Sequence, residues 1–210
     1  MGFRKGITMG NTTQGEEWVS LFDGETLNGW AATGNAKGWG VEDGCILCKA
    51  EKGGYLYLSG SAFKDFELHL SFKHVKKANS GVFFRWTDLD DPVQTGIEIQ
   101  ILDTHGVDPA TTHCSGAVYD LQAPTRNVCY VAGEWNDLEL TAKGNVIQVA
   151  MNGEQIVDMD LDRWTSPGFN PDGSPNKFNR AYCEMVDSGY IGLQDHGGRL
   201  WFRNLRIRNL

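Results

Sequence analysis

Short runs of alternating apolar and polar residues, separated by turn residues, dominate the chain. In the run 66–73, Phe, Leu, Leu and Phe alternate with Glu, His, Ser and Lys, and the runs 82–86 and 97–101 alternate in the same way. A strand places successive side chains on opposite faces, so this period of two is typical of half-buried antiparallel strands. We predict further strands in the segments 45–49, 55–59, 138–141, 146–151, 190–194 and 200–207.

Turn signals between these runs indicate antiparallel pairing. Asn152-Gly153 separates two strand-like runs, and both residues tolerate the positive φ that a type I′ hairpin turn requires. Two stretches, 103–112 and 164–187, break the alternation. About a dozen strands with so few interruptions favour an all-β fold, a sandwich of two antiparallel sheets, over a smaller immunoglobulin-type domain.

The second irregular stretch contains the one helix that we predict, near 175–186. Ser174 and Pro175 suit the N-cap and the first helical position. Four apolar residues then recur with the spacing of one helix face: Phe178, Ala181, Tyr182 and Met185.

Length and composition favour one sandwich domain over 17–210, with 1–16 as a disordered tail or cloning remnant. The tail lacks the apolar stretch of a signal peptide, which leaves the compartment open, and no run approaches the roughly 20 apolar residues of a bilayer span. The net charge of −8 disfavours nucleic acid and anionic membranes as partners, because like charges repel. The seven tryptophans and 26 glycines suit a β-rich protein that binds a neutral ligand such as a sugar.

The sequence predicts no metal site and no certain cofactor. Cys45 and Cys48 form a CxxC pair, but no second pair or closely spaced histidine pair completes a zinc site. Asp103 and His105 are close in sequence without a third ligand at a suitable spacing. A divalent cation such as Ca²⁺, held by Asp103 and neighbouring carbonyls, is left as an open alternative.

The segment 98–103 carries a short polar row on an otherwise apolar strand. Glu98 and Gln100 are two residues apart and share one face, while three isoleucines anchor the opposite face in the core. A bulge after Gln100 would bring Asp103 onto the same face. The plainer interpretation, the solvent face of an ordinary strand, is weakened by other strands that also place functional groups opposite the core.

Six more residues are candidates for the same surface. Arg85 lies between aromatic residues and would orient Glu98 or a ligand oxygen, with a surface ion pair as the alternative. His113 and His196 are proton carriers near neutral pH, although loop histidines are often simply solvated. The remaining candidates would bind or stack on a sugar, or pack in a strand: Tyr119, Trp135 and Gln194.

From residue 18 to the C-terminus the sequence resembles the 3-keto-disaccharide hydrolase domain family. Seven motifs in order carry the resemblance: SLFDGETLNGW (20–30), NSGVFFR (79–85), EIQILD (98–103), GAVY (116–119), GEWN (133–136), MNG (151–153), and GLQDHG (192–197) leading to FRN (202–204). The resemblance implies a concanavalin A-like jelly roll of bacterial origin, in a family whose members are often exported. It also implies a sugar or disaccharide substrate that has been oxidised at C3.

Laminarinase-like enzymes of that fold carry Glu-x-Asp-x-x-Glu, whereas this chain has Gln100 in the middle and Asp103 last. A glutamine cannot ionise, so the two-carboxylate retaining mechanism does not fit. A ketone at C3 instead makes the C2 proton acidic, so that a base can remove it and the C1 substituent can leave. With that chemistry the base is His113 or Glu98, Arg85 and Gln100 hold the enolate, and Tyr119 or His196 assists departure.

Two other functions stay open at this point. The same fold serves lectins, so the chain could be a non-catalytic carbohydrate-binding module. It could also be a laminarinase-like glycoside hydrolase acting on unoxidised glucan.

Overall fold

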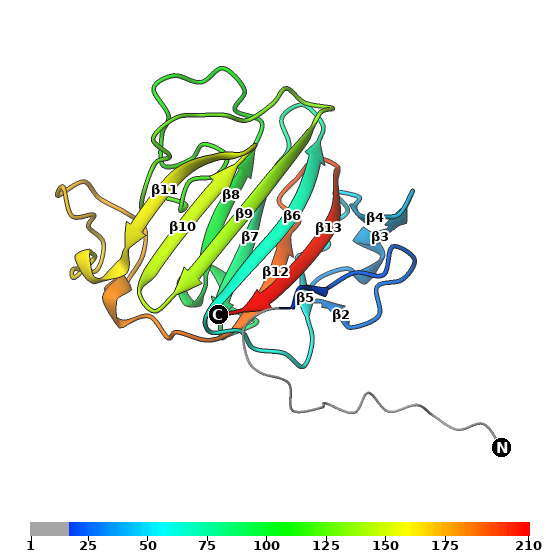
Figure 1. Cartoon of the computed structure of the whole chain (residues 1–210), viewed down its shortest axis with the longest axis horizontal. Helices are drawn as coiled ribbons and strands as arrows, with labels where there is room; N and C mark the ends of the chain where they lie inside the picture. The colour runs from blue at the N-terminus through cyan, green and yellow to red at the C-terminus, as the bar shows by residue number, and fades with distance from the viewer. Residues whose placement is uncertain (1–16) are drawn as a thin grey trace.

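The computed structural model describes residues 17–210, which form a sandwich of two antiparallel sheets around one hydrophobic core. Figure 1 shows β11, β10, β9, β6 and β13 side by side in the front layer, with β8, β7 and β12 behind them. The tail predicted for 1–16 lies outside the described residues. In residues 17–210 no helix has the length and hydropathy needed to cross a membrane.

Within the described residues, the larger sheet has eight strands, ordered β11-β10-β9-β6-β13-β4-β3, with β1 also paired to β13. Their bounds are β1 Val19–Ser20, β3 Trp39–Glu42, β4 Cys45–Cys48, β6 Phe66–His74, β9 Trp135–Lys143, β10 Val146–Met151, β11 Glu154–Asp160 and β13 Leu200–Asn209.

The smaller sheet has five strands in the same part of the chain, ordered β2-β5-β12-β7-β8. Their bounds are β2 Trp30–Ala32, β5 Tyr55–Leu58, β7 Asn79–Trp86, β8 Ile97–Leu102 and β12 Tyr190–Gln194. The helical turns are η1 Ala36–Gly38, α1 Pro92–Thr95, η2 Leu161–Arg163 and η3 Tyr182–Glu184.

The period-two pattern positions these strands as expected. In β6 the alternate residues Phe66, Leu68 and Leu70 are buried between the sheets. Asn152 and Gly153 link β10 to β11 with φ values of 54° and 80°, which fits the predicted hairpin turn. The all-β sandwich is therefore confirmed.

The helix predicted near 175–186 is wrong. Pro175 instead forms a β-bridge with Phe169, and the backbone amide of Asn176 donates to the carbonyl of Gly168. Cross-loop hydrogen bonds thus take the backbone groups that a helix would need. Only η3 forms in this segment, and the short α-helix α1 lies elsewhere in the chain.

Candidate functional site

The strand β8 presents the polar row that its sequence predicts. Ile97, Ile99 and Ile101 are buried in the core, each at most 1% exposed. Glu98 and Gln100 alternate with them and therefore point to the outer face of the smaller sheet. We call this surface the Glu98 face.

The loop segment 116–119 extends the sheet beyond β8. The amide of Tyr119 donates to the carbonyl of Glu98 (3.0 Å), and the amide of Gln100 donates to the carbonyl of Ala117 (3.0 Å). Val118 is buried in the core, so its neighbour Tyr119 points to the opposite side. Tyr119 and Glu98 consequently lie side by side on the Glu98 face.

The Glu98 side chain lies over Gly81 of β7. A Cβ atom at Gly81 would collide with the Glu98 carboxyl group, so the glycine makes the room that this side chain occupies. Phe83 pairs with Glu98 across the strands and packs against Tyr55, with ring centroids 5.0 Å apart. Gln194 donates from Nε2 to the Tyr55 hydroxyl group (3.2 Å). The carboxyl group thus has aromatic and neutral polar neighbours.

This environment changes the acidity of Glu98. Burial raises the pKa of Glu98 to about 8, although the nearby Lys177 ammonium group lowers it. No cationic side chain in residues 17–210 forms an ion pair with Glu98. A carboxyl group that titrates near neutrality in a partly enclosed site is suited to proton transfer.

Gln100 holds the Glu98 carboxyl group from one side. With its amide oriented to satisfy both of its ends, the Gln100 nitrogen donates to Glu98 Oε1 (3.0 Å) and to the carbonyl of Ser80 (3.2 Å). Gln100 is only 3% exposed, so this contact is protected from solvent. A buried amide in this position fixes the carboxyl group without adding a charge beside it.

Two histidines border the Glu98 face from different loops. His196 follows β12, and its Nδ1 lies 2.5 Å from Nδ2 of Asn79 at the start of β7. His113 Nε2 lies 3.2 Å from the Asp120 carboxylate, and its ring lies 5.0 Å from the ring of Tyr119. Both predicted histidines therefore reach the edge of this surface.

The Lys177 side chain closes the side of the face next to Tyr119. Its Nζ lies 4.2 Å from the centre of the Tyr119 ring. Its backbone amide donates to the Asp120 carboxylate (2.8 Å), which holds the loop in place. A cation stacked on an aromatic ring beside Glu98 is a source of positive charge for a developing anion.

Arg85 does not face Glu98, contrary to the prediction. Its φ of 51° coincides with a shift in the pairing of β7 with β12, and this bulge reverses the direction of its side chain. The guanidinium group is 1% exposed and lies 3.7 Å from Asp65, with a hydrogen bond to the Lys64 carbonyl. Trp86 takes the outward place, with its ring 5.2 Å from Tyr55.

Two other predicted residues also lie away from Glu98. Trp135 begins β9 and lies on the outer face of the larger sheet, where the Arg203 guanidinium stacks 3.8 Å from its ring. Asp103 lies just past the end of β8, and its Oδ2 accepts a hydrogen bond from the Lys77 amide (2.8 Å). Asp103 thus fixes the turn before β7 instead of extending the polar row.

No three His, Cys, Asp or Glu side chains gather as a metal site within residues 17–210. The Ca²⁺ ion considered at Asp103 stays a prediction.

Four residues of this surface were not among the predictions: Tyr55, Asn79, Asp120 and Lys177. The alternation Tyr-Leu-Tyr-Leu in β5 could have placed Tyr55 opposite the core, because Leu56 is buried. Lys177 had no such signal, since it reaches Glu98 only through the folding of the long loop between β11 and β12.

Comparison with known proteins identifies the family. The sequence pattern of the 3-keto-alpha-glucoside-1,2-lyase-like domain matches residues 17–208. A 3-keto-disaccharide hydrolase of Bacteroides thetaiotaomicron is 30% identical over 229 aligned positions, covering 92% of this chain and 78% of that protein.

Solved structures agree with this assignment. A candidate glycosyl hydrolase from Parabacteroides distasonis superposes with a TM-score of 0.83 at 34% identity, covering 93% of this chain and all of that one. A carbohydrate-binding module from Bacillus subtilis, at 13% identity and a TM-score of 0.55, shares the fold over 86% of this chain and 96% of its own. The fold is a jelly-roll sandwich, and the protein is carbohydrate-active. The chain belongs to the family of 3-keto-alpha-glucoside-1,2-lyase-like domains.

Proposed function

We propose that this chain is an enzyme that cleaves 3-keto glycosides at the Glu98 face. The carbohydrate-active family and the 3-keto-disaccharide hydrolase among its relatives support the substrate class. The observation that carries the proposal is the Glu98 carboxyl group, partly enclosed, without a charged partner, and with a pKa raised by burial to about 8.

In the proposed reaction, the Glu98 carboxylate removes the proton at C2. The electron pair of that bond forms the C2–C3 double bond, and the ketone oxygen becomes an enolate. The ketone then re-forms as the C2–C3 electron pair makes a double bond between C1 and C2, and the bond between C1 and the leaving oxygen breaks as that oxygen takes up a proton. Water adds to C1 and a proton returns to C2, so the net result is hydrolysis, whereas release before this addition would make the enzyme a lyase.

Besides the base, the reaction needs a group that stabilises the enolate and an acid that protonates the leaving oxygen. Lys177, stacked on Tyr119 beside Glu98, can stabilise the enolate oxygen, and Gln100 orients the Glu98 carboxyl group. His113, hydrogen-bonded to Asp120 beside Tyr119, is the proton donor for the departing oxygen in this scheme. Arg85 has no part in it, because its buried guanidinium lies beside Asp65.

The substitution Glu98→Gln tests the proposal with a chromogenic substrate, 4-nitrophenyl 3-keto-α-glucoside. We expect kcat/KM to fall by about 10²–10⁴, the usual contribution of a general base. Glu134→Gln, an exposed carboxylate before β9, is the matched control and should leave the rate unchanged. Undiminished turnover by Glu98→Gln would remove Glu98 from the mechanism.

Two further readouts separate the alternatives. NMR of the products distinguishes 3-keto-glucose, the hydrolysis product, from the unsaturated ketone that a lyase would release. Cleavage of unoxidised 4-nitrophenyl α-glucoside at a comparable rate would instead indicate an ordinary glycosidase. Binding of the keto sugar without any turnover would indicate a carbohydrate-binding module.

A further inference from the structure

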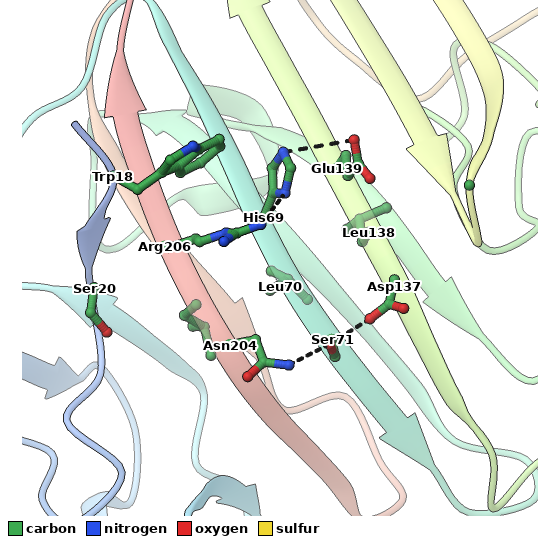
Figure 2. A pocket seen from close by; sticks show the side chains of 12 residues that line it. Trp18, Ser20, His69, Leu70, Ser71, Asp137, Leu138, Glu139, Asn204 and Arg206 are labelled. Atoms are coloured by element: carbon green, nitrogen blue, oxygen red, sulfur yellow. Dashed lines mark hydrogen bonds and ion pairs between the residues drawn. The ribbon is translucent and has the colours of Figure 1, made fainter. Parts of the chain in front are cut away.

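A groove of about 610 Å³ crosses the outer face of the larger sheet, on the side of the sandwich opposite the Glu98 face. Figure 2 shows its polar side chains arising from β6, β9 and β13, with Trp18 at one end. This volume is in the range of roughly 300–1,000 Å³ that small-molecule sites occupy. We call it the Trp18 groove.

Small residues create the hollow between longer ones. Ser71 pairs directly with Asp137 of β9, and Gly153 of the β10–β11 turn lines the far side. Trp18, which precedes β1, forms the wall at the other end, and the Arg206 guanidinium lies 4.9 Å from its ring.

A β-bulge in β13 adds one polar group to the groove. The pairing of β13 with β6 shifts between Arg203 and Arg206, and Asn204 within the bulge has a φ of 57°. Leu205 next to it is buried in the core, while Asn204 is exposed to the groove. Bulges commonly redirect a side chain beside a functional site.

The centre of the groove is a fixed network of hydrogen bonds. Asn204 donates from Nδ2 to Ser71 Oγ (3.1 Å), and Ser71 donates to Asp137 Oδ1 (2.5 Å), as the dashed lines in Figure 2 show. Within residues 17–210, no donor is bonded to the Asn204 amide oxygen or to Asp137 Oδ2. The Asn204 amide oxygen and Asp137 Oδ2 are therefore free acceptors in this part of the chain, and the bonds made by Asn204 Nδ2 and Asp137 Oδ1 hold them in place.

The end of the groove next to Trp18 contains both hydrogen-bond donors and acceptors. His69 Nδ1 lies 3.3 Å from the Arg206 guanidinium, and its Nε2 lies 3.7 Å from the Glu139 carboxylate. Burial lowers the pKa of His69, which favours the neutral ring. The formal charge of the lining is therefore one cation, Arg206, against two carboxylates, Asp137 and Glu139.

From this arrangement we infer that the Trp18 groove is a second saccharide site. It binds a neutral sugar whose hydroxyl groups donate hydrogen bonds to Asp137 and Asn204. The two carboxylates would repel an anion. An apolar ligand would displace water from the polar network without replacing its hydrogen bonds. A sugar instead supplies donors to the open acceptors, beside a Trp18 ring that already lies within 5.0 Å of the Arg206 and Arg208 guanidinium groups. We assign the groove to binding alone, and this inference does not depend on cleavage at the Glu98 face.

NMR of the full chain tests this site with two unoxidised probes, maltohexaose and cellohexaose at millimolar concentration. In the ¹H–¹⁵N spectrum we expect shifts at the Trp18 indole and at the amides around Ser71, Asp137 and Asn204. Asp137→Asn keeps the shape but removes the charged acceptor, and should weaken binding about tenfold. The control Asp158→Asn, an exposed carboxylate on β11 outside the groove, should bind as the wild type does.

The outcomes separate this inference from the proposed cleavage. Shifts in the groove that weaken in Asp137→Asn alone support it, whatever the protein does to keto sugars. If neither probe shifts these signals, or if shifts gather only around Gly81 and Tyr55, the inference is wrong. Equal affinity in wild type and Asp137→Asn also overturns it. Should Asp137→Asn lose the dispersion of a folded spectrum, Trp18→Ala at the groove wall replaces it, with the same expected weakening.

Discussion

The two outer faces of the sandwich differ in the surroundings of their carboxyl groups. On the larger sheet, the carboxylates lie beside polar or cationic groups: Arg208 lies 2.6 Å from Glu67, Ser71 donates to Asp137, and His69 lies 3.7 Å from Glu139. On the smaller sheet, Glu98 has aromatic and amide neighbours and no ion pair among residues 17–210. One jelly roll thus combines an outer face whose carboxylates have polar partners with an outer face on which burial disfavours the charged form of Glu98.

This difference indicates that the Glu98 face suits catalysis and that the outer face of the larger sheet suits binding. An acid whose charged form is disfavoured titrates near neutrality, which suits it to exchange protons with a substrate. Carboxylate and amide groups that are fixed by hydrogen bonds, with two oriented acceptor atoms free among residues 17–210, suit a ligand that is bound without being altered. The predictions below test whether this division holds, in order of decreasing effect.

The largest effect that we predict is on stability, for Glu98→Gln. The folded pKa is raised from 4.5 to about 8, so above pH 4.5 the unfolded chain loses this proton while the folded chain keeps it until about pH 8. Stability therefore falls across this interval, and the cost is fully present above pH 8. Glutamine has no such cost, and at ~1.4 kcal/mol per pKa unit the variant should be more stable by a few kcal/mol at pH 9.

Thermal unfolding at pH 4 and pH 9 measures this difference. At pH 4 wild type and Glu98→Gln should unfold at similar temperatures, because the carboxyl group is protonated in both states. The exposed control Glu134→Gln should change stability by less than ~0.5 kcal/mol at either pH. An equal Tm for wild type and Glu98→Gln at pH 9 would show that the Glu98 face does not disfavour the charged form.

The second prediction moves the carboxyl group without changing its chemistry. In Gly81→Ala the new Cβ collides with Oε1, Cγ and Cδ of Glu98, so the side chain must leave the position in which Gln100 holds it. A displacement of about 1 Å at a reacting group can cost about 10² in rate, so kcat/KM on the keto substrate should fall by that factor. The Tm should change little. Gly40→Ala is the control in the larger sheet, since its Cβ meets only the flexible end of Lys49; full activity in Gly81→Ala would argue against a positioned Glu98.

The third prediction concerns Lys177→Met. The ammonium group lowers the pKa of Glu98, so its removal raises that pKa further and leaves less carboxylate at pH 7. The rising limb of the kcat/KM profile should move to higher pH, and activity at pH 7 should fall by about threefold to tenfold. A reduced rate with an unshifted pH profile would mean that Lys177 acts in another way.

Local alternation was sufficient to predict the strands and the direction of Glu98. The isoleucines of β8 define its core face from sequence alone, and Asn152-Gly153 defines a turn, because both signals involve adjacent residues. The prediction for Arg85 was wrong because a bulge inverts the alternation at that residue. The bulge arises from pairing with β12, which is distant in the sequence. Trp135 failed because alternation tells which way a side chain points, but not which sheet the strand joins.

The loops set the other limit. Phe178 and Tyr182 have helical spacing, yet hydrogen bonds with residues 166–170 hold this loop in turns and bends, with η3 as its one helical turn. The same path brings Lys177 over Tyr119, a contact between residues 58 positions apart that no sequence pattern encodes. The candidate site is thus predictable where β8 forms it and unpredictable where the loops complete it.

The smallest effect, in a glycine variant, is expected on the other face, at Asn204. Asn204→Gly loses the hydrogen bond to Ser71 but keeps a backbone that tolerates a φ of 57°, so unfolding free energy should fall by about 0.5–1 kcal/mol. Asn204→Ala loses the same bond and adds a Cβ atom in the left-handed region, which costs about 1 kcal/mol more. Urea unfolding of the two variants measures both values, and cleavage of the keto substrate should be unchanged in each. Equal stabilities for the glycine and alanine variants would mean that the bulge does not require the left-handed backbone at Asn204, and a loss of cleavage would mean that the two faces do not act independently.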